Sequence, residues 1–208
     1  AAGIPIVFMT AWQALFNRAN LQQGETVLIH AGGGGVGTAA IQLAKRSGAT
    51  VLTTVGSSEK ADRAKSLGAD HAILYKESSF DEEAKRLTDG QGVDVIIETV
   101  AAENLPKDIQ ALRINGRIVV IGNGTGKGPE ATLPVGPSLF KELRLFSMTL
   151  NNAGAEAPDI MRGLKQAFAE GNTKPQASVS FPLKDAAQAQ QTLISGQFFG
   201  KISLSPIE

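Results

Sequence analysis

A run of four glycines between two apolar segments constrains the fold of this chain more than any other feature. The run follows Thr26–Ile29, whose β-branched sequence is typical of a buried parallel strand, and it precedes residues 36–44, whose apolar side chains recur at helical spacing. Within it, Gly32-x-Gly34-x-x-Gly37 matches the fingerprint of a strand–turn–helix unit that binds dinucleotides. We expect Gly32 to permit the tight turn, Gly34 to leave room for a pyrophosphate, and Gly37 to let the helix start close to its strand.

The start of that helix is a candidate anion site. Unpaired N–H groups and the positive end of the helix dipole would attract a pyrophosphate without any charged side chain. A merely flexible glycine loop is the alternative interpretation. The position of the glycines between a strand and a helix favours the phosphate-binding one.

The rest of the chain continues the alternation of strand and helix. Apolar and β-branched runs predict strands at 50–55, 69–75, 93–99, 117–121 and 141–148, and helical spacing predicts helices at 10–18, 59–67, 80–87, 104–112 and 159–170. Such alternation is typical of right-handed crossovers that build one parallel sheet. The sequence therefore predicts an α/β fold with a doubly wound, six-stranded parallel sheet of the Rossmann type.

The last part of the chain departs from this alternation. It predicts a strand at 178–181, a helix at 183–193 and a strand at 201–204. We expect residues 1–173 to form the dinucleotide-binding domain and residues 174–208 to be a return segment that packs elsewhere.

Charge and hydropathy argue against several classes of partner. The 20 basic and 20 acidic side chains cancel, and no like-charge run suits a nucleic acid or an anionic membrane. Apolar runs such as residues 93–97 are too short to span a bilayer, and the first residues lack a secretory signal. A cytoplasmic protein is expected. Because the chain opens at Ala1 without an initiator methionine, we also expect a segment before it.

The sequence predicts neither a metal site nor a nucleophile. It has no cysteine and two histidines, His30 and His71, so disulfides are excluded and a zinc site is not expected. His30, at the end of the first strand, is interpreted as a packed or hydrogen-bonded side chain. No Ser-His-Asp or paired-carboxylate pattern stands out, and no catalytic residue is assigned.

The end of the second strand bears on the choice of cofactor. NAD-binding domains normally carry Asp or Glu there, about twenty residues after the glycines, to bind the ribose 2′-OH. Here the strand ends in Thr53-Thr54-Val55-Gly56, and Ser57 and Lys60 follow, which could bind a 2′-phosphate. NADPH is therefore favoured. The alternatives are Glu59 as a ribose partner, Lys60 as a solvated surface lysine, and Tyr75, after the third strand, as a space-filling aromatic.

The loop after the fifth strand is a candidate contact for the nicotinamide half of the cofactor. It holds four glycines in the eight residues 122–129. Ligands of this fold bind beyond the carboxyl ends of the strands, which is where such a loop would lie. An ordinary solvent loop is the alternative.

Several further segments occur in a specific order along the whole chain. They are Ala31-x-x-Gly34-Gly35-Val36-Gly37, Ser57-x-x-Lys60-Ala61, Leu67-Gly68-Ala69-Asp70-His71 with Tyr75 after it, Gly90-x-Gly92-Val93-Asp94-Val95, the Arg117 strand, and Phe181-Pro182-Leu183-Lys184-Asp185-Ala186. Together they resemble the zinc-independent quinone oxidoreductases of the medium-chain dehydrogenase/reductase superfamily, the zeta-crystallin-like group.

The resemblance implies roles for individual residues. Lys60 and Tyr75 would hold the NADPH 2′-phosphate, Thr10 would approach the nicotinamide, and Asn123 would flank it. Gly196 stands where some members carry a basic residue towards the phosphate, so Lys60 would bear more of that contact here. Ala101 replaces the glycine usual after the fourth strand. The candidate cofactor-binding residues are Thr10, Gly32, Gly34, Gly35, Val36, Gly37, Ser57, Lys60, Tyr75, Val100, Gly122 and Asn123.

The resemblance also implies what the whole protein does. Family members begin with a catalytic domain of GroES-like fold, which this chain lacks and with which residues 174–208 would belong. The expected reaction is hydride transfer from NADPH to a quinone or another conjugated carbonyl, a small-molecule electron acceptor. The alternatives are an enoyl or alkenal reductase with the same cofactor half, and an NADPH-binding module without turnover. A homodimer through the sixth strand would cover the apolar edge of Leu143, Leu145 and Phe146.

Overall fold

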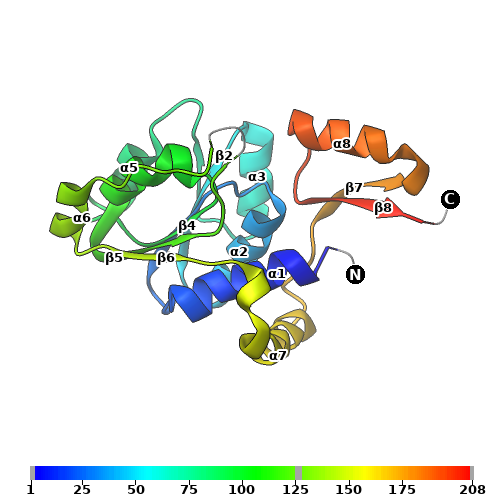
Figure 1. Cartoon of the computed structure of the whole chain (residues 1–208), viewed down its shortest axis with the longest axis horizontal. Coiled ribbons are helices and arrows are strands. Elements are labelled where there is room, and N and C mark those ends of the chain that lie inside the picture. The colour runs from blue at the N-terminus through cyan, green and yellow to red at the C-terminus, as the bar shows by residue number, and fades with distance from the viewer. Residues whose placement is uncertain (1–2, 125–127, 207–208) are drawn as a thin grey trace.

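The computed structural model describes residues 3–124 and 128–206 and contains a six-stranded parallel sheet in the order β3-β2-β1-β4-β5-β6 (Figure 1). The strands are β1 (Thr26–Ile29), β2 (Thr50–Val55), β3 (His71–Leu74), β4 (Val93–Glu98), β5 (Leu112–Val120) and β6 (Arg144–Ser147). The strand order reverses direction between β1 and β4, which makes their carboxyl ends the switch point of the fold. The predicted doubly wound α/β sheet is confirmed.

Helices cover both faces of the sheet. They are α1 (Pro5–Trp12), α2 (Gly35–Arg46), α3 (Ser58–Ser66), α4 (Phe80–Arg86), α5 (Ala101–Ala111), α6 (Val135–Lys141), α7 (Ala157–Ala169) and α8 (Ala186–Ser195). In the central strand, Val27 and Ile29 belong to a core shared with α1, α2, α3 and α7, whereas Leu28 belongs to a core shared with α4 and α5. Strands buried on both faces read as continuous apolar runs. Among the described residues, no helix combines the length and apolar character needed to cross a bilayer.

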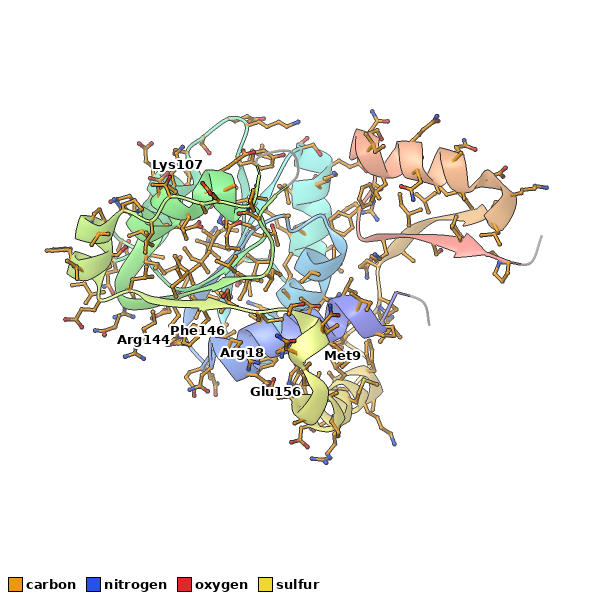
Figure 2. The ribbon with its side chains drawn as sticks, viewed as in Figure 1. Met9, Arg18, Lys107, Arg144, Phe146 and Glu156 are labelled. Atoms are coloured by element: carbon orange, nitrogen blue, oxygen red, sulfur yellow. The ribbon has the colours of Figure 1, made fainter. Side chains whose placement is uncertain are left out.

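The amino-terminal helix begins earlier than the predicted residues 10–18. Pro5 occupies its first turn, where proline is favoured, and the helix continues beyond Trp12 as a π-helix, Gln13–Arg18. The π-helix directs three donors at one carboxylate on the segment before α7: Gln13 Nε2 lies 3.1 Å, Asn17 Nδ2 2.9 Å and Arg18 Nη1 2.9 Å from Glu156. Figure 2 shows Arg18 beside Glu156. This contact anchors the helix against a segment far away in the sequence.

Other element boundaries also differ from expectation. The helix α5 starts at Ala101, three residues before the predicted start, and it contains Pro106. The strand β5 starts at Leu112, before the predicted start at 117, and it runs through Asn115, whose φ is +63°, where its register against β4 shifts between Val93 and Val95. The short helix α6 was not expected, since Gly136 and Pro137 obscure its pattern.

The sixth strand lies at the sheet edge, as predicted, but its apolar residues are less open than expected. Leu143 and Phe146 are partly buried against the two cores. Of the three residues expected to form an apolar edge, Leu145 is the exposed one, at 42%. Neighbouring α6 exposes more apolar surface, with Leu139 at 73% and Phe140 at 76%.

The C-terminal residues form a separate small unit. The strands β7 (Ala177–Pro182) and β8 (Lys201–Ser205) pair in parallel with each other, and α8 connects them. In Figure 1 this unit lies to the side of α3, apart from the six-stranded sheet. It touches the main sheet's glycine turn, because Gly200 N donates to Gly33 O at 2.8 Å.

Candidate cofactor-binding site

The glycine turn between β1 and α2 differs in detail from the expected one. Gly32 lies inside the tight turn as expected, because Gly34 N donates to Ala31 O at 2.8 Å across it, but Ala31 is the residue with the left-handed conformation, at φ +54°. Gly32 is required for another reason: a Cβ there would lie 2.0 Å from the hydroxyl of Thr53. That hydroxyl is held in place, because it donates to Ile29 O at 2.7 Å.

The third glycine of the fingerprint has the expected role. A Cβ on Gly37 would lie 2.2 Å from the carbonyl oxygen of Ala31 and 2.8 Å from the Cα of Gly32. No side chain fits between the helix and the turn at this point, so Gly37 lets α2 begin directly against the end of β1.

The start of α2 presents backbone donors at the carboxyl edge of the sheet. Thr38 N donates to Gly34 O at 2.9 Å. The amides of Gly35, Val36 and Gly37 precede it in the first turn, where helix geometry provides no intrahelical acceptor. Together with the helix dipole, these N–H groups are suited to a pyrophosphate.

The residues expected at the 2′-phosphate follow the ends of β2 and β3. Ser57 is the N-cap of α3, and its hydroxyl accepts from Lys60 N at 3.4 Å. Tyr75 directly follows β3 and is 53% exposed. Its hydroxyl crosses towards β2, since a Cβ on Gly56 would lie 3.1 Å from it. Ser57 and the Tyr75 hydroxyl therefore border the end of the second strand, whereas the Lys60 ammonium is directed at Gly196 O.

The Lys60 side chain links three parts of the molecule. Its Cδ lies 3.1 Å from the position of a Cβ on Gly33, so its stem runs beside the glycine turn. Its Nζ donates to Gly196 O at 2.6 Å, at the C-terminus of α8, and lies 5.8 Å from the ring centroid of Phe198. The resemblance implies that some family members carry a basic side chain at this position, and here the backbone carbonyl of Gly196 accepts a hydrogen bond from the Lys60 ammonium.

A second group of predicted residues lies at the ends of β4 and β5. Val100 and Asn123 form an antiparallel bridge, and Ala101 N donates to Gly122 O at 3.3 Å. A Cβ on Gly122 would lie 2.7 Å from Thr99 O, so the two turns are in direct contact. Residues 125–127 of the predicted glycine loop lie outside the described part of the chain.

Thr10 is not shown beside either group. It lies on α1, where its hydroxyl donates to Ile6 O at 2.7 Å. None of the contacts described for it reaches the glycine turn or the β4 and β5 turns. Its expected proximity to a nicotinamide therefore stays a prediction.

Two residues of the return segment border the site and were missed from the sequence. Gly200 pairs with Gly34 as an isolated parallel bridge, and its φ is +81°. The Cδ of Lys201 lies 2.5 Å from the position of a Cβ on Gly35. A cavity of about 240 Å³ lies between α8, β8 and Gly35. A glycine followed by a lysine at 200–201 was the sequence signal that could have indicated a phosphate contact. The sequence does not show that the fold of the return segment places these residues at the glycine turn.

A buried polar cluster under the site was also missed. His30, Glu98 and Asp108 are at most 2% exposed. His30 Nε2 lies 2.9 Å from Asp108 Oδ1 and 3.4 Å from Glu98 Oε2, and His30 Nδ1 lies 3.0 Å from Thr54 Oγ1. His30 and Glu98 end adjacent strands, which the sequence could have indicated, whereas Asp108 comes from α5 and only tertiary packing brings it there.

Burial dominates the electrostatics of this cluster. It raises the pKa of the Glu98 carboxyl to about 7, with His30 opposing the rise and Asp108 adding to it. It likewise raises the pKa of Asp108 to about 7, and Asp81 on α4 adds to this rise. Burial lowers the pKa of His30. Low dielectric disfavours the charged form of each group, so burial opposes the accumulation of charge in the cluster.

Comparison with known proteins shows the family. Residues 35–166 match the model of the zinc-binding dehydrogenase family. The quinone oxidoreductase of Mus musculus is 37% identical over 94% of this chain, and the chain spans 58% of that protein. Polyketide synthases also match, such as a highly reducing one from Penicillium oxalicum, which is 34% identical over 99% of this chain; the chain spans 8% of its length.

Solved structures agree with this assignment. The Escherichia coli quinone oxidoreductase complexed with NADPH has a TM-score of 0.88 and 29% identity, over 99% of this chain and 64% of the other. The CurK enoyl reductase has a TM-score of 0.85 and 30% identity, over 98% of this chain and 61% of the other. The chain therefore belongs to the zinc-binding dehydrogenase family, as an NAD(P)-binding domain of the medium-chain dehydrogenase/reductase superfamily.

Proposed function

We propose that this chain binds NADPH along the carboxyl edge of its sheet. The pyrophosphate would accept hydrogen bonds from the amides at the start of α2. The 2′-phosphate would lie among Ser57, Lys60 and Tyr75, and the nicotinamide would face the turns of Val100 and Asn123. The observation that carries the proposal is the convergence of Lys60 and Tyr75 on the turn and strand end that a Rossmann fold uses for the adenosine half.

The preference for NADPH over NADH rests on charge. A carboxylate at the end of β2 would repel a 2′-phosphate, and that end is occupied by Thr54, Val55 and Gly56. Lys60 supplies a positive charge within reach of the glycine turn. Glu59, the nearest acid, lies in the first turn of α3 instead of at the strand end. The NADPH complex of the E. coli relative supports the same choice.

We infer that the reaction takes place in a longer protein that supplies the other wall of the active site. The return segment exposes apolar side chains that a neighbouring domain could cover: Leu183 (57%), Leu193 (50%), Ile194 (84%) and Leu204 (41%). Bound NADPH would supply a hydride to a quinone or another conjugated carbonyl. The described residues of this chain would bind and orient the cofactor. An electron-poor acceptor would need no zinc ion.

A second candidate function is enoyl or alkenal reduction with the same cofactor half. It is favoured by the similarity to the CurK enoyl reductase and to polyketide synthases. The cofactor site would be unchanged, and the difference would lie in the substrate pocket of the other domain. An NADPH-binding module without turnover is the third possibility.

Two measurements test the proposed function. Fluorescence titration of the 208-residue chain should give tighter binding of NADPH than of NADH. Single-turnover oxidation of NADPH by quinones and by enones should then be compared between the chain and the longer protein, with the chain slow or inactive. Failure of the chain to bind NADPH would refute the cofactor assignment, and equal turnover by the chain alone would refute the two-domain account.

We also propose a homodimer through the β6 edge. The strand is the last in the sheet order, Leu145 on it is exposed, and α6, which precedes it in the chain, exposes Leu139 and Phe140. Pairing two such edges would satisfy backbone groups and cover apolar surface.

A further inference from the structure

The hydrogen-bond partners of His30 favour one tautomer of the neutral ring. Thr54 Oγ1 accepts from Ala31 N at 3.2 Å, and its own proton has the His30 Nδ1 atom as a neighbour at 3.0 Å. If Nδ1 accepts that proton, Nε2 carries the hydrogen of the neutral ring and directs it at Asp108 and Glu98. The ring is further enclosed by Phe80, whose centroid lies 4.6 Å away in an edge-on contact.

The two carboxyl groups have too few donors to be ionised together. Glu98 Oε1 accepts from Val100 N, and Asp108 Oδ1 faces His30 Nε2 at 2.9 Å. Within the described residues, the other oxygens, Glu98 Oε2 and Asp108 Oδ2, are buried without a hydrogen-bond partner. An oxygen of Glu98 and one of Asp108 lie within 4.8 Å of each other. Two buried like charges this close are strongly unfavourable, and one proton between them would remove a charge and supply a donor.

We propose that Glu98 and Asp108 share a single proton, and that the protonated pair, held by His30, positions the two turns that receive the cofactor. On one side, Glu98 fixes Val100, which bridges to Asn123. On the other side, His30 fixes Thr54, whose hydroxyl holds the left-handed Ala31 at the glycine turn. Glu98, Asp108 and His30 are positioning residues, because they would act on the cofactor through these turns. This consequence for the cofactor rests on the proposed function, whereas the shared proton does not.

The charged and titratable groups around the pair come from each packed element. His30 faces it from β1, Asp81 from α4, and the pair itself joins β4 to α5. Asp81 disfavours a negative charge on Asp108, in the same direction as burial. Loss of the shared proton would place two like charges in the cluster, with His30 held neutral by burial.

The pH dependence follows with a definite sign. The pKa of each carboxyl is raised on folding, so the folded pair retains a proton that the unfolded chain has already lost, and stability decreases as pH rises towards about 7. The lowered pKa of His30 acts in the opposite sense below about 6.5, because the unfolded histidine takes up a proton there. The two effects offset each other in mildly acidic solution, so the net decline falls between about pH 6.5 and the folded carboxyl pKa of about 7, and stability levels off above it.

The test compares wild type with Glu98→Gln, which keeps an acceptor for Val100 N and a donor for Asp108 but cannot ionise. Melting temperatures of both proteins are measured from pH 5.5 to 8.5. Because both proteins contain His30, the difference between their profiles reports the carboxyl pair. Across this range, the melting temperature of the wild type should fall by about 4 to 8 °C relative to that of Glu98→Gln. This is the effect expected when the wild type releases one proton from a group with a folded pKa of about 7. Glu82→Gln, an exposed carboxyl on α4, is the matched control and should follow the wild-type profile.

Two further readouts separate the proton from a merely structural role. Infrared spectra at pH 6.5 should show a protonated carboxylic acid that both Glu98→Gln and Asp108→Asn remove. The ratio of NADPH dissociation constants, wild type over Glu98→Gln, should rise with pH, and this ratio cancels the titration of the 2′-phosphate itself. Glu98→Ala should weaken NADPH by about 10-fold, because it leaves Val100 N without its acceptor.

Three results would overturn the proposal. They are the absence of the carboxylic acid band, parallel stability profiles for wild type and Glu98→Gln, or a stoichiometric metal ion in the purified protein, which would replace the proton. If the wild type binds no NADPH, the proposed function fails, and the spectra and melting profiles still decide whether the proton is shared. If NADPH binds but the ratio is independent of pH, the positioning role fails.

Discussion

Replacement of Lys60 by alanine should weaken NADPH much more than NADH. The ammonium can contact the 2′-phosphate, which NADH lacks, while its stem lies beside Gly33. A charge-assisted hydrogen bond contributes about 1.5 to 3 kcal/mol. Lys60 is partly exposed, so solvent screening favours the lower part of this range. We expect a loss of about 10- to 30-fold in NADPH affinity.

The contact with Gly196 complicates the substitution and suggests its control. Lys60 Nζ donates to Gly196 O at 2.6 Å, so Lys60→Ala also removes a tie to the return segment. That loss should affect both cofactors alike, and the change in the NADPH-to-NADH ratio isolates the phosphate contact. Lys65→Ala, on the same helix, matches the change in charge and should leave the ratio unchanged.

The assay is calorimetric titration of both cofactors into the three proteins. It should be repeated at high salt, where the preference for NADPH should shrink because the contact is ionic and partly exposed. Equal losses for the two cofactors in Lys60→Ala would refute the reasoning. A wild type that prefers NADH would do the same, and would make Glu59 the better candidate for the ribose.

Three more substitutions test other parts of the site. Tyr75→Phe removes one neutral hydroxyl and should reduce NADPH affinity by less than 10-fold. The same titration measures this, and a larger loss would contradict the expectation. Gly37→Ala places a Cβ 2.2 Å from a carbonyl oxygen and should cost about 1 to 3 kcal/mol or more in urea unfolding, whereas Gly136→Ala, with open space around it, should change stability little. Leu145→Asp should weaken a dimer in sedimentation, and a wild type that stays monomeric at high concentration would refute the β6 interface.

The main elements could be predicted because their signals are local. A β-branched run such as Thr26–Ile29 favours a buried strand, and the glycine spacing after it favours a helix packed directly against that strand. The clash at Gly37 confirms that part of the prediction. The early start of α1, by contrast, could not be predicted, because residues 5–12 are apolar on all sides and pack against both α2 and α7.

Roles that depend on long-range contacts required the tertiary structure. The sequence indicated Lys60 as a basic residue near the phosphate, but not that its ammonium reaches Gly196, 136 positions later. It indicated a turn at Gly32 but not that Ala31 takes the left-handed conformation. These contacts and conformations depend on which residues meet in the folded chain, and local sequence propensity carries no information about such meetings.

By itself, the sequence determined the doubly wound sheet and the place of its phosphate-binding turn, because strand and helix periodicity and glycine spacing act within a few residues of the chain. Only the tertiary structure decided that His30, Glu98 and Asp108 share one buried cluster. In the sequence, each of these polar residues alone is an ordinary residue at a strand end or in a helix. Their meeting depends on α5 packing over the β1–β4 switch point, and burial there, not composition, shifts their pKa values.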